Sequence, residues 1–457
     1  MSVFNALLTA VAGLRSQAFA LANISGNIAN SQTTAFKRVD NSFVDLVPDA
    51  PFRREFAGSV GAFSRSTNTL QGDLQTTNVN THMALNGRGY FVVQERTGYA
   101  NNQPVFGGVD YYTRRGDFTV DKDGYLNNGA GYYLKGTSID PTTGQSSGGS
   151  AGIIKISSAP IPAKPTSEIV YQANLPSYPA TTTAVSTTAQ SELINATGFS
   201  VNPLTTGTNT VVANDQGLFL GQSIPGGSIT VYNDVGAPVN VQLRWAKVSS
   251  STYGNPDVWN LFHLENANAT GVGVAWRNVG TPITFNSSGQ MTSATSINIP
   301  ALSVNGTSVG SVDIKFGNSG LTQFADANGQ AKTSALTQNG YSSGTLDRIS
   351  VTSDGRISGN YSNGQVLSIA SLSLAQFNAD NALKRSDGGV FEQTLESGTP
   401  SLSGSGITVV GGSLEGANTD IAEEFSKMII TQQAYSANTR VVSTAREMLE
   451  SVINIIR

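Results

Sequence analysis

Apolar residues near the N-terminus recur with a seven-residue step in two offset rows. Together they form one narrow a/d seam: Phe4, Leu7, Val11, Leu14, Ala18, Leu21 and Ile28. Two apolar positions per heptad are typical of helix-against-helix packing, whereas a helix on a globular core usually has a third. The pattern predicts a helix over residues 3–30, followed by polar residues that favour a turn.

The C-terminal segment repeats this pattern independently. Its seam consists of Ile421, Phe425, Met428, Tyr435, Val442, Leu449 and Ile456. Asp420, with Glu423 three residues later, resembles a capping box at the start of a helix over residues 420–456. Because the two seams match, we predict that the terminal helices pair as a coiled-coil-like stalk. Two helices leave most of each seam half exposed, so we expect other copies of the chain to cover it.

Between the helices the pattern changes. Short segments of alternating apolar and polar residues, such as 89–93, 229–232 and 239–243, predict strands. Asn-Gly and Asp-Gly pairs between such segments favour tight hairpin turns. The predicted fold class is therefore mainly β with α-helical termini, in which nested antiparallel β domains are inserted between the paired helices.

Changes in composition divide the chain into domains. Residues 140–152 are rich in Thr, Gly and Ser, and residues 159–165 are rich in Pro, as linkers often are. The predicted parts are a terminal helical assembly domain (1–35 and 415–457), an extended linker (36–70), a core β domain (71–144 and 340–410) and an inserted outer β domain, of one or two subdomains (145–339).

The composition excludes several kinds of chemistry. The 457 residues include no cysteine, which excludes disulfides, zinc–thiolate sites, iron–sulfur clusters and a thiol nucleophile. His82 and His263 are the only histidines, too few for a histidine-rich metal site. Only 13% of the residues are charged, against ~25% in an average domain, and the net charge of −4 offers no basic surface for nucleic acid.

Short matches to functional motifs are better explained by turns. Residues 115–117 (RGD) match an integrin-binding tripeptide but lie where a turn precedes a predicted strand. Residues 121–124 (DKDG) resemble the opening of a calcium loop, but Tyr132 stands where the bidentate Glu belongs. A two-carboxylate glycosidase is the enzyme class that the sequence leaves open. We predict no catalytic, cofactor-binding or metal site, and no enzymatic activity.

The apolar N-terminus could be taken for a signal peptide. However, no Lys or Arg precedes the apolar residues, and Arg15 lies between them and the nearest possible cleavage site. No uncharged apolar stretch reaches 18 residues. We therefore predict that this helix is retained, is not a cleaved signal and does not span a membrane.

Several segments resemble the bacterial flagellar rod and hook protein family. Residues 27–38 (NIANSQTTAFKR) resemble its N-terminal signature, with Ala35 where Gly is usual. The signature positions of this chain are Asn27, Asn30, Thr33, Phe36 and Lys37. The other similar segments, which follow in the family's order, are 84–91, 112–118, 123–126, 231–236, 320–324, 354–365, 414–421 and 432–438. Those at 231–236, 320–324 and 354–365 point to hook proteins within the family.

The resemblance implies a structural subunit of the flagellar hook. Such subunits form a curved tubular polymer of one subunit type, a flexible universal joint that transmits motor torque to the filament. The implied partners are other copies of the chain, the flagellar rod, the hook cap, the hook–filament junction and hook-length-control proteins, and the flagellar export apparatus. The implied location is extracellular, in the hook of the basal body, reached by type III export without a cleaved signal.

Three alternatives remain at this point. A distal rod protein resembles both ends of the chain but normally lacks an insertion as large as 145–339. A secreted β-rich adhesin or carbohydrate-binding protein would work as a monomer on a helical stalk. A simple dimeric coiled coil is the third, although Gln432 and Thr439 on the C-terminal seam would weaken a dry dimer core.

Overall fold

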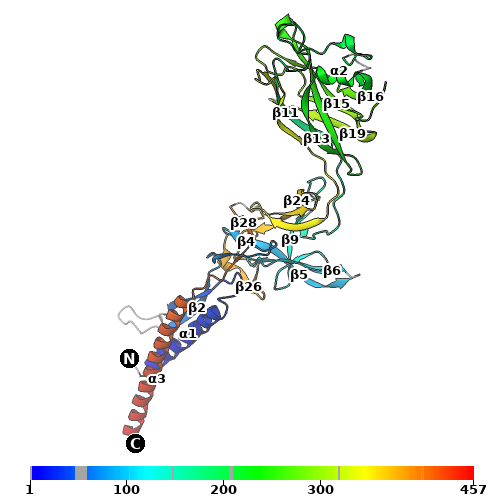
Figure 1. The fold of residues 1–457 in the computed structure, drawn as a ribbon. Coiled ribbons are helices and arrows are strands. Elements are labelled where there is room, and N and C mark those ends of the chain that lie inside the picture. The colour runs from blue at the N-terminus through cyan, green and yellow to red at the C-terminus, as the bar shows by residue number, and fades with distance from the viewer. Residues whose placement is uncertain are drawn as a thin grey trace. The chain divides into compact units, whose positions relative to one another are not determined.

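The computed structural model describes residues 3–46, 59–101, 103–146, 149–204, 209–317, 320–402, 404 and 406–456. It divides into two compact units (Figure 1). Unit 1 comprises Met1–Ala159, Leu346–Tyr361 and Val366–Arg457, and unit 2 comprises Pro160–Thr345 and Ser362–Gln365. The prediction of a mainly β chain with a helix at each end is confirmed.

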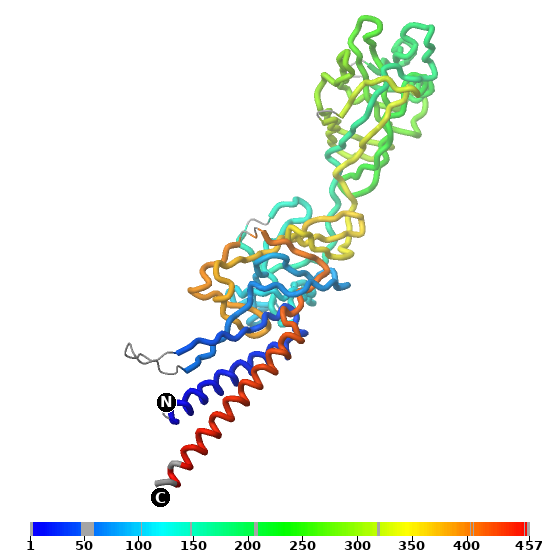
Figure 2. The backbone as a smooth tube through the Cα atoms, turned by 90° about the vertical axis from the view of Figure 1, so that its left-hand side faces the viewer, coloured from blue at the N-terminus to red at the C-terminus, as the bar shows by residue number. Residues whose placement is uncertain are grey.

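The terminal helices of unit 1 are α1 (Val3–Ala29) and α3 (Ile421–Ile456), close to the predicted bounds. Asp420 starts α3, because its Oδ1 accepts hydrogen bonds from the backbone N–H groups of Ala422 (2.8 Å) and Glu423 (3.2 Å). The two helices lie side by side and run in opposite directions, and α3 extends beyond the start of α1 (Figure 2). By length and composition α1 could also cross a membrane. The absence of a membrane span therefore stays a prediction.

Strands β1 (Val39–Leu46) and β2 (Ser59–Ser66) form an antiparallel pair beside α1. The other strands of unit 1 are β3 (Leu74–Thr76), β4 (Met83–Asn86), β5 (Tyr90–Ala100), β6 (Gln103–Thr113), β7 (Thr119–Val120), β8 (Leu126–Asn127), β9 (Tyr132–Ser138), β10 (Gly152–Ile153), β22 (Leu346–Val351), β23 (Arg356–Tyr361), β24 (Val366–Leu372), β25 (Leu374–Ala375), β26 (Lys384–Ser386), β27 (Val390–Glu392), β28 (Thr408–Gly411) and β29 (Ser413–Glu415).

The main sheet of unit 1 joins strands from both halves of the chain. Its order is β22-β23-β24-β9-β5-β6-β27-β26, and all of these neighbours are antiparallel. Phe91, Phe118 and Leu134 are fully buried in its principal core. Two smaller pairs, β28–β4 and β29–β3, bring the segment before α3 beside the strands that follow β2. The chain therefore enters and leaves the β part of unit 1 at one place.

Unit 2 consists of β11 (Glu168–Pro176), β12 (Thr210–Val212), α2 (Gln216–Gly221), β13 (Ile224–Tyr232), β14 (Pro238–Ser249), β15 (Asp257–Leu264), β16 (Val274–Asn278), β17 (Ile283–Phe285), β18 (Ser296–Val304), β19 (Thr307–Lys315), β20 (Leu321–Phe324) and β21 (Lys332–Gln338). One sheet has the order β18-β19-β11-β20 and the other β12-β16-β15-β14-β13. Tyr171, Trp245 and Trp259 are fully buried in a core to which both sheets contribute. Unit 2 is thus built from two sheets that share one core.

One strand of unit 2 departs from the predicted antiparallel arrangement. β11 pairs in parallel with β19 and with β20, and antiparallel with β21. Parallel neighbours need a long connection, and here more than a hundred residues separate β11 from its partners in sequence. Short-range turn signals describe hairpins and therefore could not predict this pairing.

Candidate self-assembly surface

The buried face of α1 carries mostly small side chains. It consists of Ala10, Gly13, Ser16, Ala20, Ile24 and Asn27. Gly13 lies close to α3, because a Cβ built at this position would be 3.0 Å from the side-chain amide of Asn438. On the side of β2, the Ser16 hydroxyl donates a hydrogen bond to the Val60 carbonyl (3.0 Å). Small residues thus allow α3 and the β1–β2 pair to approach α1 closely.

The predicted N-terminal seam is not this buried face. Its residues are half-buried at Leu7, Val11, Leu14, Leu21 and Ile28, and exposed at Phe4 and Ala18. Phe4 keeps 61% of its surface exposed. The face of α1 that is covered by α3 and by the β1–β2 pair is therefore the row of mostly small residues, and the larger apolar side chains lie beside or outside it.

The predicted C-terminal seam is more exposed still. Ile421, Phe425, Tyr435 and Leu449 are exposed, and Met428 and Val442 are half-buried. The side chain of Ile456 lies outside the described residues. Further large apolar side chains that sequence reasoning did not single out are also exposed on the two helices: Leu8, Phe19, Ile429, Ile430, Val441, Met448 and Ile453. The exposed apolar residues of α1 and α3 together define the candidate assembly surface.

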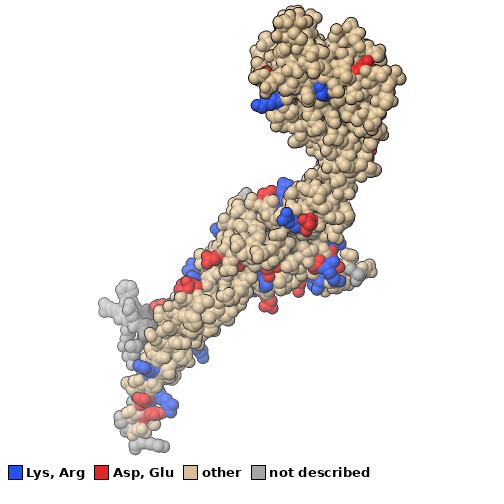
Figure 3. Space-filling model, viewed as in Figure 1, with Lys and Arg blue, Asp and Glu red and all other residues tan. Residues whose placement is uncertain are grey.

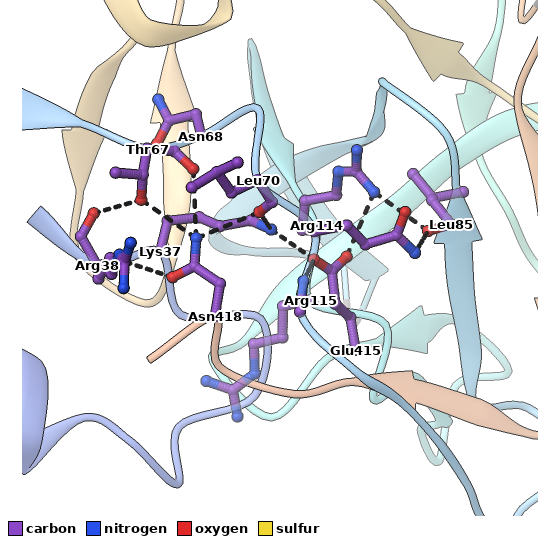
Figure 4. A network of polar contacts seen from close by, with 12 residues as sticks. Lys37, Arg38, Thr67, Asn68, Leu70, Leu85, Arg114, Arg115, Glu415 and Asn418 are labelled. Carbon is purple, nitrogen blue, oxygen red and sulfur yellow. Dashed lines mark hydrogen bonds and ion pairs between the residues drawn. The ribbon is translucent and has the colours of Figure 1, made fainter. Parts of the chain in front are cut away.

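At the base of the helices, three buried charged residues join distant segments (Figure 4). Lys37 donates hydrogen bonds to the Leu70 carbonyl (2.6 Å) and to Glu415 Oε1. Arg114 Nη1 lies 3.3 Å from Glu415 Oε2, and the side chains of Lys37, Glu415 and Arg114 are 1%, 0% and 3% exposed. Burial lowers the pKa of Lys37, although the Glu415 carboxylate opposes this shift. We call Lys37, Glu415 and Arg114 the buried charge triad.

A second set of contacts holds the start of α3 against the end of α1. Asn27 Nδ2 donates to Glu424 Oε2 (2.9 Å), and Asn27 also exchanges hydrogen bonds with the backbone of Val39. Asn418 Oδ1 accepts from the Arg38 N–H (2.7 Å), and its Nδ2 donates to the Leu70 carbonyl (3.2 Å). These side chains satisfy backbone groups where the chain enters and leaves the helices.

Three family models match separate parts of the chain. "Flagellar hook protein FlgE/F/G D1 domain" matches residues 84–167, "Flagellar basal body protein FlaE D2 domain" residues 226–341 and "Flagellar basal body rod FlgEFG protein C-terminal" residues 410–455. Flagellar hook protein FlgE of Brucella suis is 28% identical over 461 residues, with 100% of both chains covered. FlgE of Escherichia coli is 28% identical over 455 residues, with 98% of both covered. The chain belongs to the flagellar hook protein family.

A solved structure shows the same fold. The crystal structure of Helicobacter pylori flagellar hook protein FlgE2 matches with a TM-score of 0.50 at 15% identity, covering 75% of this chain and 100% of that chain. Flagellar hook proteins are structural proteins and not enzymes. Among the described residues, no group of three His, Cys, Asp or Glu side chains lies close enough to hold a metal ion.

The family-signature residues lie in the last turn of α1 and in the segment that follows it. Asn30 Nδ2 donates to the Gly26 carbonyl (2.9 Å), and Thr33 Oγ1 donates to Asn30 Oδ1 (3.1 Å). The guanidinium of Arg385 lies 4.6 Å from the centre of the Phe36 ring. Together with Asn27 and Lys37, described above, these residues shape the turn and attach it to the rest of unit 1.

Ala35, at the position where the family usually has Gly, adopts a left-handed backbone conformation with φ of 56°. A left-handed conformation costs a non-glycine residue ~1–2 kcal/mol. The Ala35 N–H donates to the Glu415 carbonyl (2.8 Å), so this backbone geometry also serves the contact with β29. Glycine adopts a left-handed conformation without this cost, which explains why Gly is usual at this position in the family.

Proposed function

We propose that this chain is a structural subunit of the bacterial flagellar hook, which assembles with copies of itself into a curved tube. The tube acts as a flexible universal joint that transmits motor torque to the filament. The observation that carries the proposal is the pair of terminal helices, which use small residues for their own contact and leave large apolar side chains outside. Exposed apolar rows on long helices are expected where other copies pack against them.

The predicted seam residues fit this role. We propose that Phe4, Leu7, Phe425 and Tyr435, with the other seam residues, are covered by neighbouring subunits, in a packing that resembles a coiled coil. Fully burying one such side chain contributes ~1.5–3 kcal/mol. Several contacts of this size per subunit would hold a long polymer together.

The proposed roles of the other parts follow the predicted domains. The core β domain (71–144 and 340–410) stacks between subunits, and the inserted domain (145–339) forms the outer surface. A bendable tube needs outer contacts that exchange partners, which small polar groups and water allow. The visible face of unit 2 carries few charged residues and is thus suited to such contacts (Figure 3). We also propose an extracellular location in the hook, reached by flagellar export without a cleaved signal, with rod, hook-cap, junction and length-control proteins as partners.

Negative-stain microscopy of two purified variants tests the assembly surface. In the first variant Phe425→Gln and Ile429→Gln remove two exposed apolar side chains, which are 49% and 55% exposed. In the matched control Gln433→Ala and Ser436→Ala alter exposed polar positions of the same helix. We expect tubes from the unchanged chain and from the control, and monomers with unchanged helix content from the first variant.

The alternatives give different results in the same experiment. A monomeric adhesin would give monomers from all three chains, and deleting residues 1–30 would leave its binding intact. Tubes from the Phe425→Gln, Ile429→Gln variant, as abundant as those from the control, would contradict the proposed surface.

A further inference from the structure

Unit 2 carries an exposed loop that is rich in hydroxyl side chains. Residues 179–191 have the sequence PATTTAVSTTAQS, which contains no charged residue. Ser/Thr-rich segments with Pro and small residues are the composition typical of O-glycosylated chains. The sequence alone does not distinguish a modified loop from an ordinary polar one, but the hydrogen bonds of the loop do separate its hydroxyls into two groups.

Hydroxyls at the base of the loop are used within the fold. Thr182 Oγ1 donates to the Gly221 carbonyl (3.1 Å), and Thr183 Oγ1 lies 3.3 Å from the Ser191 carbonyl. Ser191 Oγ accepts from the Val185 N–H (2.8 Å) and so closes the loop. These three hydroxyls help to hold the loop in place and are therefore occupied.

The hydroxyls at the tip have no such role. Ser186, Thr187 and Thr188 are consecutive and exposed, and their hydroxyls form no hydrogen bond with another described residue. The backbone that carries them is nevertheless fixed. The Thr188 N–H donates to the Val185 carbonyl (2.8 Å), and the Gln190 N–H donates to the Tyr253 hydroxyl (2.8 Å). The loop thus presents three free hydroxyls on an ordered support.

A polar cavity opens next to the tip. Its volume is ≈ 610 Å³, within the ~300–1,000 Å³ typical of ligand pockets, and its lining includes Ala189 and Gln190, which directly follow the tip. Asn195 and Gln222 also line it and contribute side-chain amides. Amides and hydroxyls are the groups that hydrogen-bond the hydroxyls of a sugar ring. A sugar attached at the tip would therefore have a polar surface to lie against.

We propose that Ser186, Thr187 and Thr188 are acceptors for O-linked glycosylation by a transferase that uses a nucleotide-activated sugar. In this step the side-chain oxygen attacks the anomeric carbon of the sugar. The new C–O bond forms as the bond between the anomeric carbon and the nucleoside diphosphate breaks. The hydroxyl proton is taken up by a base of the transferase, and the nucleoside diphosphate leaves with its electron pair.

Intact-mass spectrometry of the full chain, purified from the cells that produce it naturally, tests the proposal. We expect a mass above that of the sequence by whole sugar residues, and electron-transfer fragmentation should place them on Ser186, Thr187 or Thr188. A mass equal to that of the sequence, or sugars found only outside the loop, would overturn the proposal.

Two variants expressed in the same cells complete the test. Replacing Ser186, Thr187 and Thr188 by Ala should remove the added mass completely. In the control, Ser287 and Ser288 are replaced by Ala. They are consecutive exposed serines of another turn in unit 2, and their replacement should leave the added mass unchanged. Because the readout is mass and not assembly, this result is independent of whether the chain forms tubes.

Discussion

The replacement of Lys37 by Met tests how the two ends of the chain are held together. Met has a similar length but no charge, so the change removes the bonds of Lys37 to Glu415 and to the Leu70 carbonyl. Glu415 then remains fully buried with Arg114, 3.3 Å away, as its nearest counter-charge. The substitution therefore removes the shortest hydrogen bond of a buried carboxylate and leaves it with the more distant Arg114 and the Gly72 N–H (3.0 Å) as partners.

The expected loss of folding stability is large because the Lys37–Glu415 ion pair is buried. Removing one partner of a buried ion pair costs ~3–5 kcal/mol. Three contacts place this case at the lower end, ~3 kcal/mol: Arg114 still faces Glu415, the Gly72 N–H still donates to Glu415 Oε1 (3.0 Å), and Asn418 Nδ2 still donates to the Leu70 carbonyl. Adding Glu415→Gln should cost less than the two single changes predict, by ~0.5–3 kcal/mol, because the groups interact directly.

Urea unfolding of the monomeric chain at neutral pH measures this cost separately in each unit. Circular dichroism of the helices reports on α1 and α3, and tryptophan fluorescence reports on unit 2, which contains all three tryptophans. Lys37→Met should lower the helix midpoint and leave the fluorescence midpoint unchanged. Lys384→Met, which breaks an exposed pair with Glu392 at 2.8 Å, should change neither. Equal helix midpoints for Lys37→Met and Lys384→Met would refute the assignment of a stabilising role to the buried charge triad.

Three further changes have effects that the same measurements detect. Ala35→Gly should raise the free energy of unfolding of unit 1 by ~0.5–1 kcal/mol, because it relieves the left-handed strain but adds unfolded-chain entropy; an unchanged or lower value would contradict this. Gly13→Leu should destabilise the helices by ~1–3 kcal/mol, because its side chain meets Asn438; a higher helix midpoint would count against close packing there. Burial lowers the pKa of His263. The stability that the neutral His263 side chain contributes to unit 2 is therefore fully present above about pH 6.5, and it is lost as the pH falls through the lowered pKa. His263→Gln should therefore flatten the fall in the fluorescence midpoint between about pH 7.5 and 5.5, and an equally steep fall would disprove the assignment.

Local signals in the sequence predicted the local structure well. The end of the apolar periodicity and the acidic start at Asp420 placed both helices within a residue or so of their observed bounds. Asn305 and Gly306 have φ of 51° and 80°, as a tight hairpin turn between β18 and β19 requires. These features depend on neighbouring residues only, which is why a pattern along the chain contains them.

The buried charge triad could not be predicted in the same way. Lys37 and Glu415 are 378 positions apart, and nothing in a short window around either residue indicates a partner. Exposed and buried charges look alike in a sequence, since burial is decided by the tertiary fold. The resemblance to the family was the only available signal, because it marked Lys37 as a signature position and included Glu415 in a second similar segment.

The contact between the helices shows why apolar periodicity indicated an interface but not its partner. Ala10, Gly13 and Ala20 carry too little apolar surface to stand out in such a pattern. They nevertheless belong to the buried face of α1, where small side chains allow α3 and the β1–β2 pair to pack closely. The large apolar residues do stand out, and the fold of a single chain leaves many of them exposed. A helix pair that buried its large residues internally would have little left to offer a neighbour. Because each exposed Phe or Ile can still contribute ~1.5–3 kcal/mol on burial, the free energy of the terminal helices depends on assembly. A chain with only 13% charged residues also limits the repulsion that would accumulate between identical copies.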